Sequence, residues 1–191
     1  MNVLLAYVLG TAIAFTNIQT DQHDKFLAAS NRESIWKTTD GQLVLLDLNG
    51  QRRTIFSDKS VITAVFLNSD RILLTRFKRK NIVIDRAGDI KYTLPSYLYA
   101  DYIPDQTGTR FVVYERGRSI SHQLSDGSYN KMRVAVFSTD HGEKLFEYKW
   151  SALKNEDVHG FGVRISDDGS KLYLERATGL TTFSLPPVQR H

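Results

Sequence analysis

The sequence has 191 residues, of which 41% are hydrophobic and 24% charged, and its formal net charge is +4. These values are typical of a folded globular chain and exclude an intrinsically disordered one. The absence of cysteine excludes disulfides, thiolate metal sites and cysteine nucleophiles. An isoelectric point near 9.2 is mildly basic and falls short of a dedicated nucleic-acid binder, so we expect no nucleic-acid partner. The length predicts a single domain over residues 1–191.

The N-terminal stretch from Val3 to Phe15 is almost wholly apolar but too short for a transmembrane helix. Two interpretations of it stay open. It is either a pair of strands, Val3–Val8 and Ala12–Thr20, or a signal peptide with a small-residue cleavage site at Ala12-Ile13-Ala14. No lysine or arginine precedes Lys25, and this favours the strands. The protein is accordingly either cytoplasmic or exported, and no membrane span is expected.

Further along the chain, apolar residues recur at period two or in short runs rich in Val, Ile, Tyr and Phe. This pattern predicts strands and no helix. Asn31–Ser34 is interpreted as a polar connection, and Arg116–Asn130 as a polar insertion. The expected strands are Phe26–Ala29, Leu43–Leu48, Arg53–Phe56, Val61–Leu67, Arg71–Phe77, Asn81–Asp85, Ile90–Leu94, Tyr99–Ile103, Arg110–Glu115, Arg133–Ser138, Lys144–Trp150, Gly162–Ile165, Lys171–Arg176 and Leu180–Leu185. The last group has three strands where the others have four.

Turn sequences repeat between these groups of strands. Leu46-Asp47-Leu48-Asn49-Gly50 matches Ile84-Asp85-Arg86-Ala87-Gly88, which lies 38 positions later (84 − 46), and loosely matches Phe137–Gly142. A period near 40 residues with four strands per repeat is typical of propeller blades.

The repeats resemble WD-repeat-like and YVTN-type β-propellers. Ser166–Tyr173 is similar to their S-P-D-G-x-x-L-Y turn between strands a and b, and Leu46–Gly50 to their turn between strands c and d. The resemblance covers most of residues 40–185, although the Trp-Asp and Gly-His pairs of the strict WD pattern are lacking. It implies an all-β, propeller-like array of about four antiparallel four-stranded blades. The incomplete last group favours an open arc or a fragment of a larger propeller over a closed ring. An antiparallel sandwich is the alternative.

The resemblance also implies at which end of a sheet each connection lies, with the four strands of a blade lettered a to d in chain order. The a–b and c–d turns lie at one end, and the b–c and d–a connections lie at the other. Basic residues gather in two b–c connections. They are Arg76, Lys78, Arg79 and Lys80 in one, and Arg116, Arg118 and Lys131 around the next. We expect this basic surface to bind a protein, a peptide or another acidic partner, or a phosphate group. Charged hairpin tips also discourage edge aggregation, and that alternative stays open.

A possible loop cluster is formed by His122, Glu156, Asp157 and His159, which the same rule places at one end. Imidazole and carboxylate groups can bind a metal or transfer protons, but no tight ligand spacing supports a metal site. Asp167-Asp168-Gly169 is interpreted as a turn and not as a calcium loop. No catalytic residue, metal or cofactor is expected.

These patterns predict a non-catalytic binding or scaffold module that uses a propeller face. The alternative is a propeller enzyme, either a metal-dependent hydrolase or a quinoprotein-like oxidoreductase. The resemblance implies that such an enzyme carries carboxylate, Asn and His ligands near a central axis, and the sequence identifies no such set. Open blade edges are also expected to promote self-association.

Overall fold

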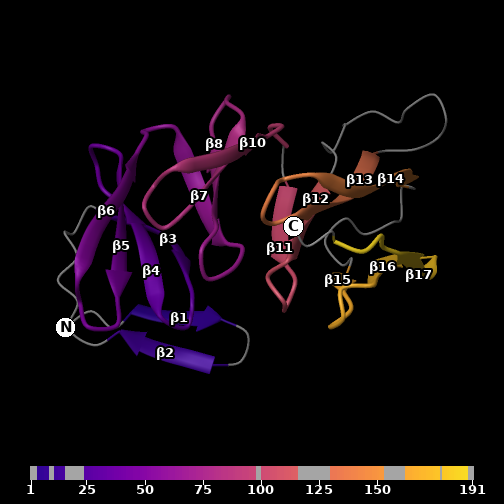
Figure 1. Ribbon diagram of the computed structural model, residues 1–191, viewed down its shortest axis with the longest axis horizontal. Helices are drawn as coiled ribbons and strands as arrows, with labels where there is room; N and C mark the ends of the chain where they lie inside the picture. The colour runs from indigo at the N-terminus through magenta and orange to yellow at the C-terminus, as the bar shows by residue number, and fades with distance from the viewer. Residues whose placement is uncertain are drawn as a thin grey trace. The chain divides into compact units, whose positions relative to one another are not determined.

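The protein is built from β-strands in two compact units, Met1–Phe66 with Asp70–Ser96, and Leu67–Ser69 with Tyr97–His191. The computed structural model describes residues 4–8, 11–15, 24–97, 100–115, 130–152, 162–176 and 178–188, and these contain no helix. Figure 1 shows the strands in chain order. The all-β prediction is confirmed, and the expectation of a single domain over residues 1–191 stays a prediction.

The first unit contains an N-terminal hairpin and two four-stranded antiparallel sheets. The hairpin pairs β1 (Leu4–Val8) with β2 (Thr11–Phe15), as the strand interpretation of the N-terminus predicts. One sheet has the order β3-β4-β5-β6 and the other β10-β9-β8-β7, so consecutive strands are neighbours. Their bounds are β3 Lys25–Ala29, β4 Glu33–Lys37, β5 Gln42–Asp47, β6 Arg52–Ser57, β7 Val61–Phe66, β8 Ile72–Arg76, β9 Asn81–Ile84 and β10 Ile90–Leu94.

Strand β4 was not expected, because Glu33 and Ser34 were interpreted as part of a polar connection. Ser34 is buried, and its hydroxyl accepts a hydrogen bond from the indole nitrogen of Trp36 at 2.9 Å. A serine with a satisfied hydroxyl is tolerated inside a sheet, so tertiary packing overrides its low strand propensity. The prediction of a connection there was wrong at these two positions.

The repeated turn predicted from the sequence is confirmed by its hydrogen bonds. A carboxylate oxygen of Asp47 accepts from the backbone nitrogens of Asn49 and Gln51 at 2.9 and 2.8 Å. In the next sheet Asp85 accepts in the same way from Ala87 and Asp89, at 2.9 and 3.0 Å. Such local acceptance is why Asp is favoured at this position of a turn.

The core of the first unit lies between its two four-stranded sheets. Apolar side chains of β4 to β6 pack with those of β7 to β9 in one buried cluster. The turn after Asp85 also approaches β6 closely: Gly88 has φ +95, and a Cβ built on it would collide with the carbonyl oxygen of Ile55. Only glycine fits this position.

The second unit contains a four-stranded antiparallel sheet, β11-β12-β13-β14, and a three-stranded one, β15-β16-β17. The three strands of the last sheet agree with the incomplete last repeat. Strand bounds are β11 Ala100–Pro104, β12 Arg110–Glu115, β13 Asn130–Ser138, β14 Lys144–Ala152, β15 Val163–Ile165, β16 Lys171–Arg176 and β17 Gly179–Ser184. His141 lies in the turn between β13 and β14, as expected.

The core of the second unit joins its two sheets. Buried residues of β12, β13 and β14 pack against Leu172 and Leu174 of β16. The ring of Phe183 in β17 lies 5.0 Å from that of Phe146 and 4.8 Å from that of Tyr148, both in β14. These aromatic contacts hold the last strand against the larger sheet.

Candidate functional site

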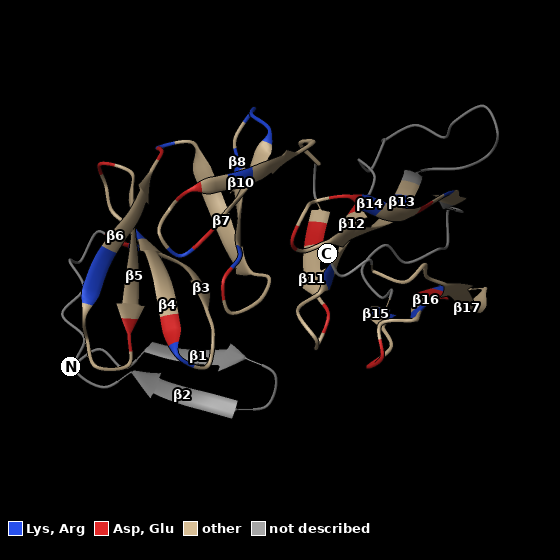
Figure 2. Cartoon of the chain, in the orientation of Figure 1, with Lys and Arg blue, Asp and Glu red and all other residues tan. Residues whose placement is uncertain are grey.

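The turn between β8 and β9 carries the densest group of basic residues that the sequence predicted. Lys78, Arg79 and Lys80 are exposed, and Figure 2 shows the lysines and arginines gathered there. Lys78 has φ +55, the one positive value of a non-glycine residue in the described part of the chain. The turn is therefore tight, and it projects consecutive cations from the end of a buried hairpin.

Arg76, the fourth predicted cation, folds back toward the body of the unit. Its guanidinium donates to Asp58 at 3.3 Å and to the carbonyl oxygen of Lys80 at 2.7 Å. Burial would raise the pKa of Asp58, but hydrogen bonds from Ser60 and the Arg76 charge lower it below its usual value. Arg76 thus positions the turn.

The structure adds basic residues that the sequence analysis missed. The backbone nitrogen of Phe77 donates to the carbonyl oxygen of Ser60 at 2.8 Å, so the β6–β7 connection lies beside the β8–β9 turn. This brings the exposed Lys59 to the same end of the unit. The side chain of Lys37 donates to the carbonyl oxygens of Lys59 and Val61, both at 2.7 Å. Lys59 lies in a d–a connection, and the propeller resemblance places d–a and b–c connections at the same end of the sheets. Lys59 could therefore have been assigned to this surface from the sequence.

The exposed cations at this end, Lys59, Lys78, Arg79 and Lys80, are termed the basic tip. Hydrogen bonds within the unit fix Arg76 and Lys37, while the four residues of the tip face solvent. Cations close together on a turn raise the local positive potential and attract anionic groups. The geometry suits recognition of an anion, which requires only exposed positive charge on an ordered turn.

The other predicted site residues are placed only in part. Lys131 lies in β13, in the second unit. Six further residues lie outside the described residues: Arg116, Arg118, His122, Glu156, Asp157 and His159. The loop cluster and the second half of the basic surface therefore stay predictions.

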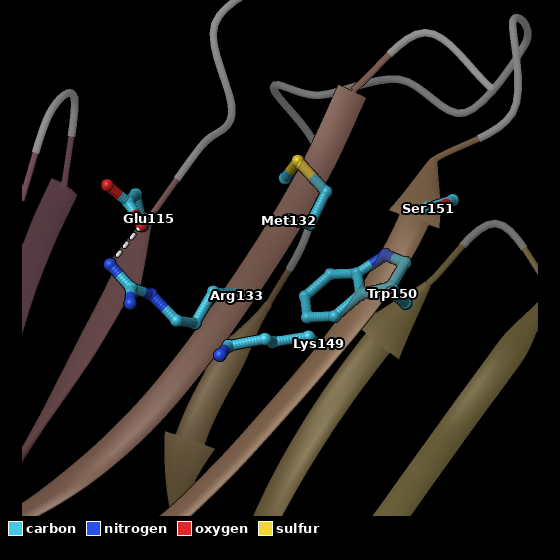
Figure 3. A pocket seen from close by; sticks show the side chains of 6 residues that line it. All are labelled: Glu115, Met132, Arg133, Lys149, Trp150 and Ser151. Atoms are coloured by element: carbon cyan, nitrogen blue, oxygen red, sulfur yellow. Dashed lines mark hydrogen bonds and ion pairs between the residues drawn. The ribbon is translucent and has the colours of Figure 1, made fainter. Parts of the chain in front are cut away.

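A second candidate site is a hollow of about 480 Å³ at the end of β12, β13 and β14. Figure 3 shows its lining residues, with Glu115 and Arg133 joined across neighbouring strands. Arg133 donates to Glu115 at 2.5 Å, lies 3.6 Å from Glu147, and its guanidinium is 4.5 Å from the ring centroid of Tyr97. Its charge is already satisfied by two carboxylates and a ring, so the hollow offers little to a charged ligand.

Acidic groups elsewhere have structural roles. Asp168 accepts hydrogen bonds from the side chain of Ser166 and from the backbone and side chain of Ser170, and these lower its pKa to about 2. The interpretation of this segment as a turn is confirmed.

No group of three metal-ligating side chains occurs among the described residues. In the same ranges, no helix is long and apolar enough to cross a membrane.

Several solved structures have a fold similar to that of this chain. The designed protein Ika4 is similar with a TM-score of 0.51 and 13% identity, over 89% of this chain and 96% of that one. The tricorn protease is similar with a TM-score of 0.58 and 12% identity, over 86% of this chain and 16% of that one. BamB from Moraxella catarrhalis gives a TM-score of 0.50 and 16% identity, over 83% of this chain and 44% of that one. No family model matches the sequence, and no curated protein gives a significant match.

These likenesses bear on the fold and not on activity, because the identities are low. The chain spans less than half of the length of the two natural proteins. The similar structures are β-propellers. The chain is therefore an all-β protein of β-propeller-like fold, built from antiparallel sheets of consecutive strands.

Proposed function

We propose that the protein is a non-catalytic binding module whose basic tip binds an acidic segment of a protein or peptide partner. One observation carries the proposal. Within the described residues, Lys78, Arg79 and Lys80 are exposed and lack a carboxylate partner. Five other basic residues of the same unit pair with a carboxylate: Arg52 with Asp24, Arg71 with Asp70, Arg76 with Asp58, Arg86 with Glu33 and Lys91 with Asp85. What distinguishes the β8–β9 turn is that its three exposed cations are consecutive in the chain.

The position of the tip supports binding. The strands that carry it, β8 and β9, are largely buried, and Arg76 ties the turn to Asp58. A partner therefore meets cations whose backbone is already ordered, which reduces the entropy lost on binding. The exposed charges increase the rate of encounter with an anionic segment and disfavour basic partners.

The proposal is tested by titrating a short fluorescein-labelled peptide of alternating Glu and Ser into the full chain and following anisotropy. Reversing two charges, with Arg79→Glu and Lys80→Glu together, should weaken binding about tenfold at low salt. Raising the salt concentration to about 0.15 M should also reduce the affinity of this variant less than that of the unaltered chain. The matched control reverses Arg32 and Arg53, which are exposed in the same unit and outside the tip.

The control variant should bind as the unaltered chain does. Equal weakening in both variants would show that net charge, and not the basic tip, governs binding. If the tip variant keeps its affinity but aggregates, the cations serve solubility and the proposal fails.

A further inference from the structure

Two exposed apolar residues lie at the same end of β7 and β8 as the basic tip. The pairing of these strands shifts register between Val61, which faces Arg76, and Thr63, which faces Thr75. The shift leaves Ile62 as the extra residue of a bulge. Val61 is 2% exposed, whereas Ile62 is 41% exposed. The bulge therefore turns a large aliphatic side chain toward solvent.

Phe77 is the second apolar residue, at the start of the β8–β9 turn. Its side chain is 61% exposed, and its backbone nitrogen bonds to Ser60, the residue that precedes β7. The ammonium of Lys78 lies 5.2 Å from the centroid of the Phe77 ring. Aromatic surface and positive charge are thus adjacent at one end of the hairpin.

This combination is uncommon on the described surface. Five large hydrophobic residues are exposed there, and they are Leu48, Ile62, Phe77, Ile90 and Leu180. Two of the five, Ile62 and Phe77, lie at the end of β7 and β8 that carries the basic tip. Scattered single apolar residues need no explanation, but exposed apolar residues that share one end of a hairpin with exposed cations are a candidate for an interaction surface.

We propose that the segment bound by the basic tip is an acidic peptide with a large aliphatic or aromatic residue beside its carboxylates. This inference rests on the proposed function and specifies its partner. The carboxylates meet Lys78, Arg79 and Lys80, while the apolar side chain covers Phe77 and Ile62. The opposite charges increase the rate of encounter and orient the peptide. Removal of apolar surface from water adds affinity that salt does not screen.

The number of cations favours a peptide over an anionic membrane. Four lysine or arginine residues near a lipid surface raise affinity on the order of a thousandfold, and stable anchoring needs a second signal. A peptide that follows the tip can place carboxylates and an apolar group against it together. The tip therefore suits a short mixed segment better than an extended charged surface.

The inference is tested with two fluorescein-labelled peptides of equal length and charge. One alternates Glu and Ser, and in the other Leu and Phe replace two central serines. The full chain should bind the second peptide about tenfold more tightly, a difference of about 1.4 kcal/mol. Phe77→Ser should remove most of this preference and leave affinity for the Glu/Ser peptide unchanged. Ile62→Thr should reduce it, and Ile90→Ser, a matched loss of an exposed aliphatic group on β10, should not.

The outcomes separate the two proposals. If the two peptides bind with equal affinity and Phe77→Ser changes neither affinity, the inference is wrong while the proposed function stands. If neither peptide binds, the proposed function is wrong and the inference falls with it. Tighter binding to phosphatidylserine vesicles or to single-stranded DNA than to either peptide, lost in Phe77→Ser, would also overturn the inference. An unchanged melting temperature of Phe77→Ser would show that the lost preference does not come from unfolding.

Discussion

The guanidinium of Arg110 donates a hydrogen bond of 2.7 Å to the carbonyl oxygen of Pro186, a residue 76 positions away. The bond joins the start of β12 to the segment that follows β17. Arg110 is 5% exposed, and burial lowers its pKa while the charges of Asp105 and Asp168 act in the opposite direction. A buried cation thus connects the two sheets of the second unit.

Replacing Arg110 with Met should destabilise the second unit by about 1–3 kcal/mol, because it removes the charged hydrogen bond to the carbonyl oxygen of Pro186 and the cation that faces Asp105 and Asp168. Arg110→Lys should cost less, since it keeps the charge. Urea unfolding followed by tryptophan fluorescence measures the change. Arg164→Met on β15, which is exposed, is the control and should stay within about 0.5 kcal/mol. Equal stability of both Met variants would contradict this role for Arg110.

Two glycines in equivalent turns should respond differently to alanine. Both Gly50 and Gly88 have positive φ, so each substitution should cost about 1 kcal/mol of backbone strain. A Cβ on Gly88 would also collide with the carbonyl oxygen of Ile55, whereas Gly50 has no neighbour within 4 Å. Gly88→Ala should therefore lose clearly more stability than Gly50→Ala, by about 1–3 kcal/mol. Thermal unfolding of the two variants makes the comparison, and equal losses would contradict it.

The sequence predicts the repeated turns of the fold better than its local irregularities, such as the buried Ser34 and the bulge at Ile62. Asp47 and Asp85 mark their turns because the carboxylate bonds to nearby backbone whatever surrounds it. Ser34 gives no such signal, since its burial depends on a bond to a neighbouring side chain. The bulge at Ile62 leaves no mark in the apolar pattern. The basic tip was predicted in part, because its lysines and arginines are consecutive, while Lys59 joins them only through the neighbouring connection.

Acid should selectively weaken the turn that holds Asp168. Its pKa is about 2 in the folded protein, against a usual value of 3.8. A lowered folded pKa stabilises the protein above about pH 4, and this contribution is lost as the pH falls toward 2. Asp168→Asn should therefore lower the melting temperature at pH 6, and the difference from the unaltered chain should shrink by pH 2. Asp167→Asn is the control, and a difference independent of pH would contradict the assignment.

Self-association should depend on the edge of the three-stranded sheet. β17 is the last strand of that sheet, and Leu180 on it is 59% exposed. Exposed edge strands pair with other chains, and lysine on such an edge opposes this. Light scattering of concentrated protein should show species larger than a monomer, and Leu180→Lys should reduce them. A clean monomer at all concentrations would contradict the expectation.

Lys78 has a consequence for anyone who engineers this protein. Its left-handed backbone, φ +55, is a conformation that glycine or asparagine adopts at lower cost. A search for thermostability would therefore select Lys78→Gly early, for a gain of about 1 kcal/mol. The same change would remove the first of the three consecutive cations of the turn. The proposed function therefore predicts that the more heat-resistant variant binds acidic peptides more weakly.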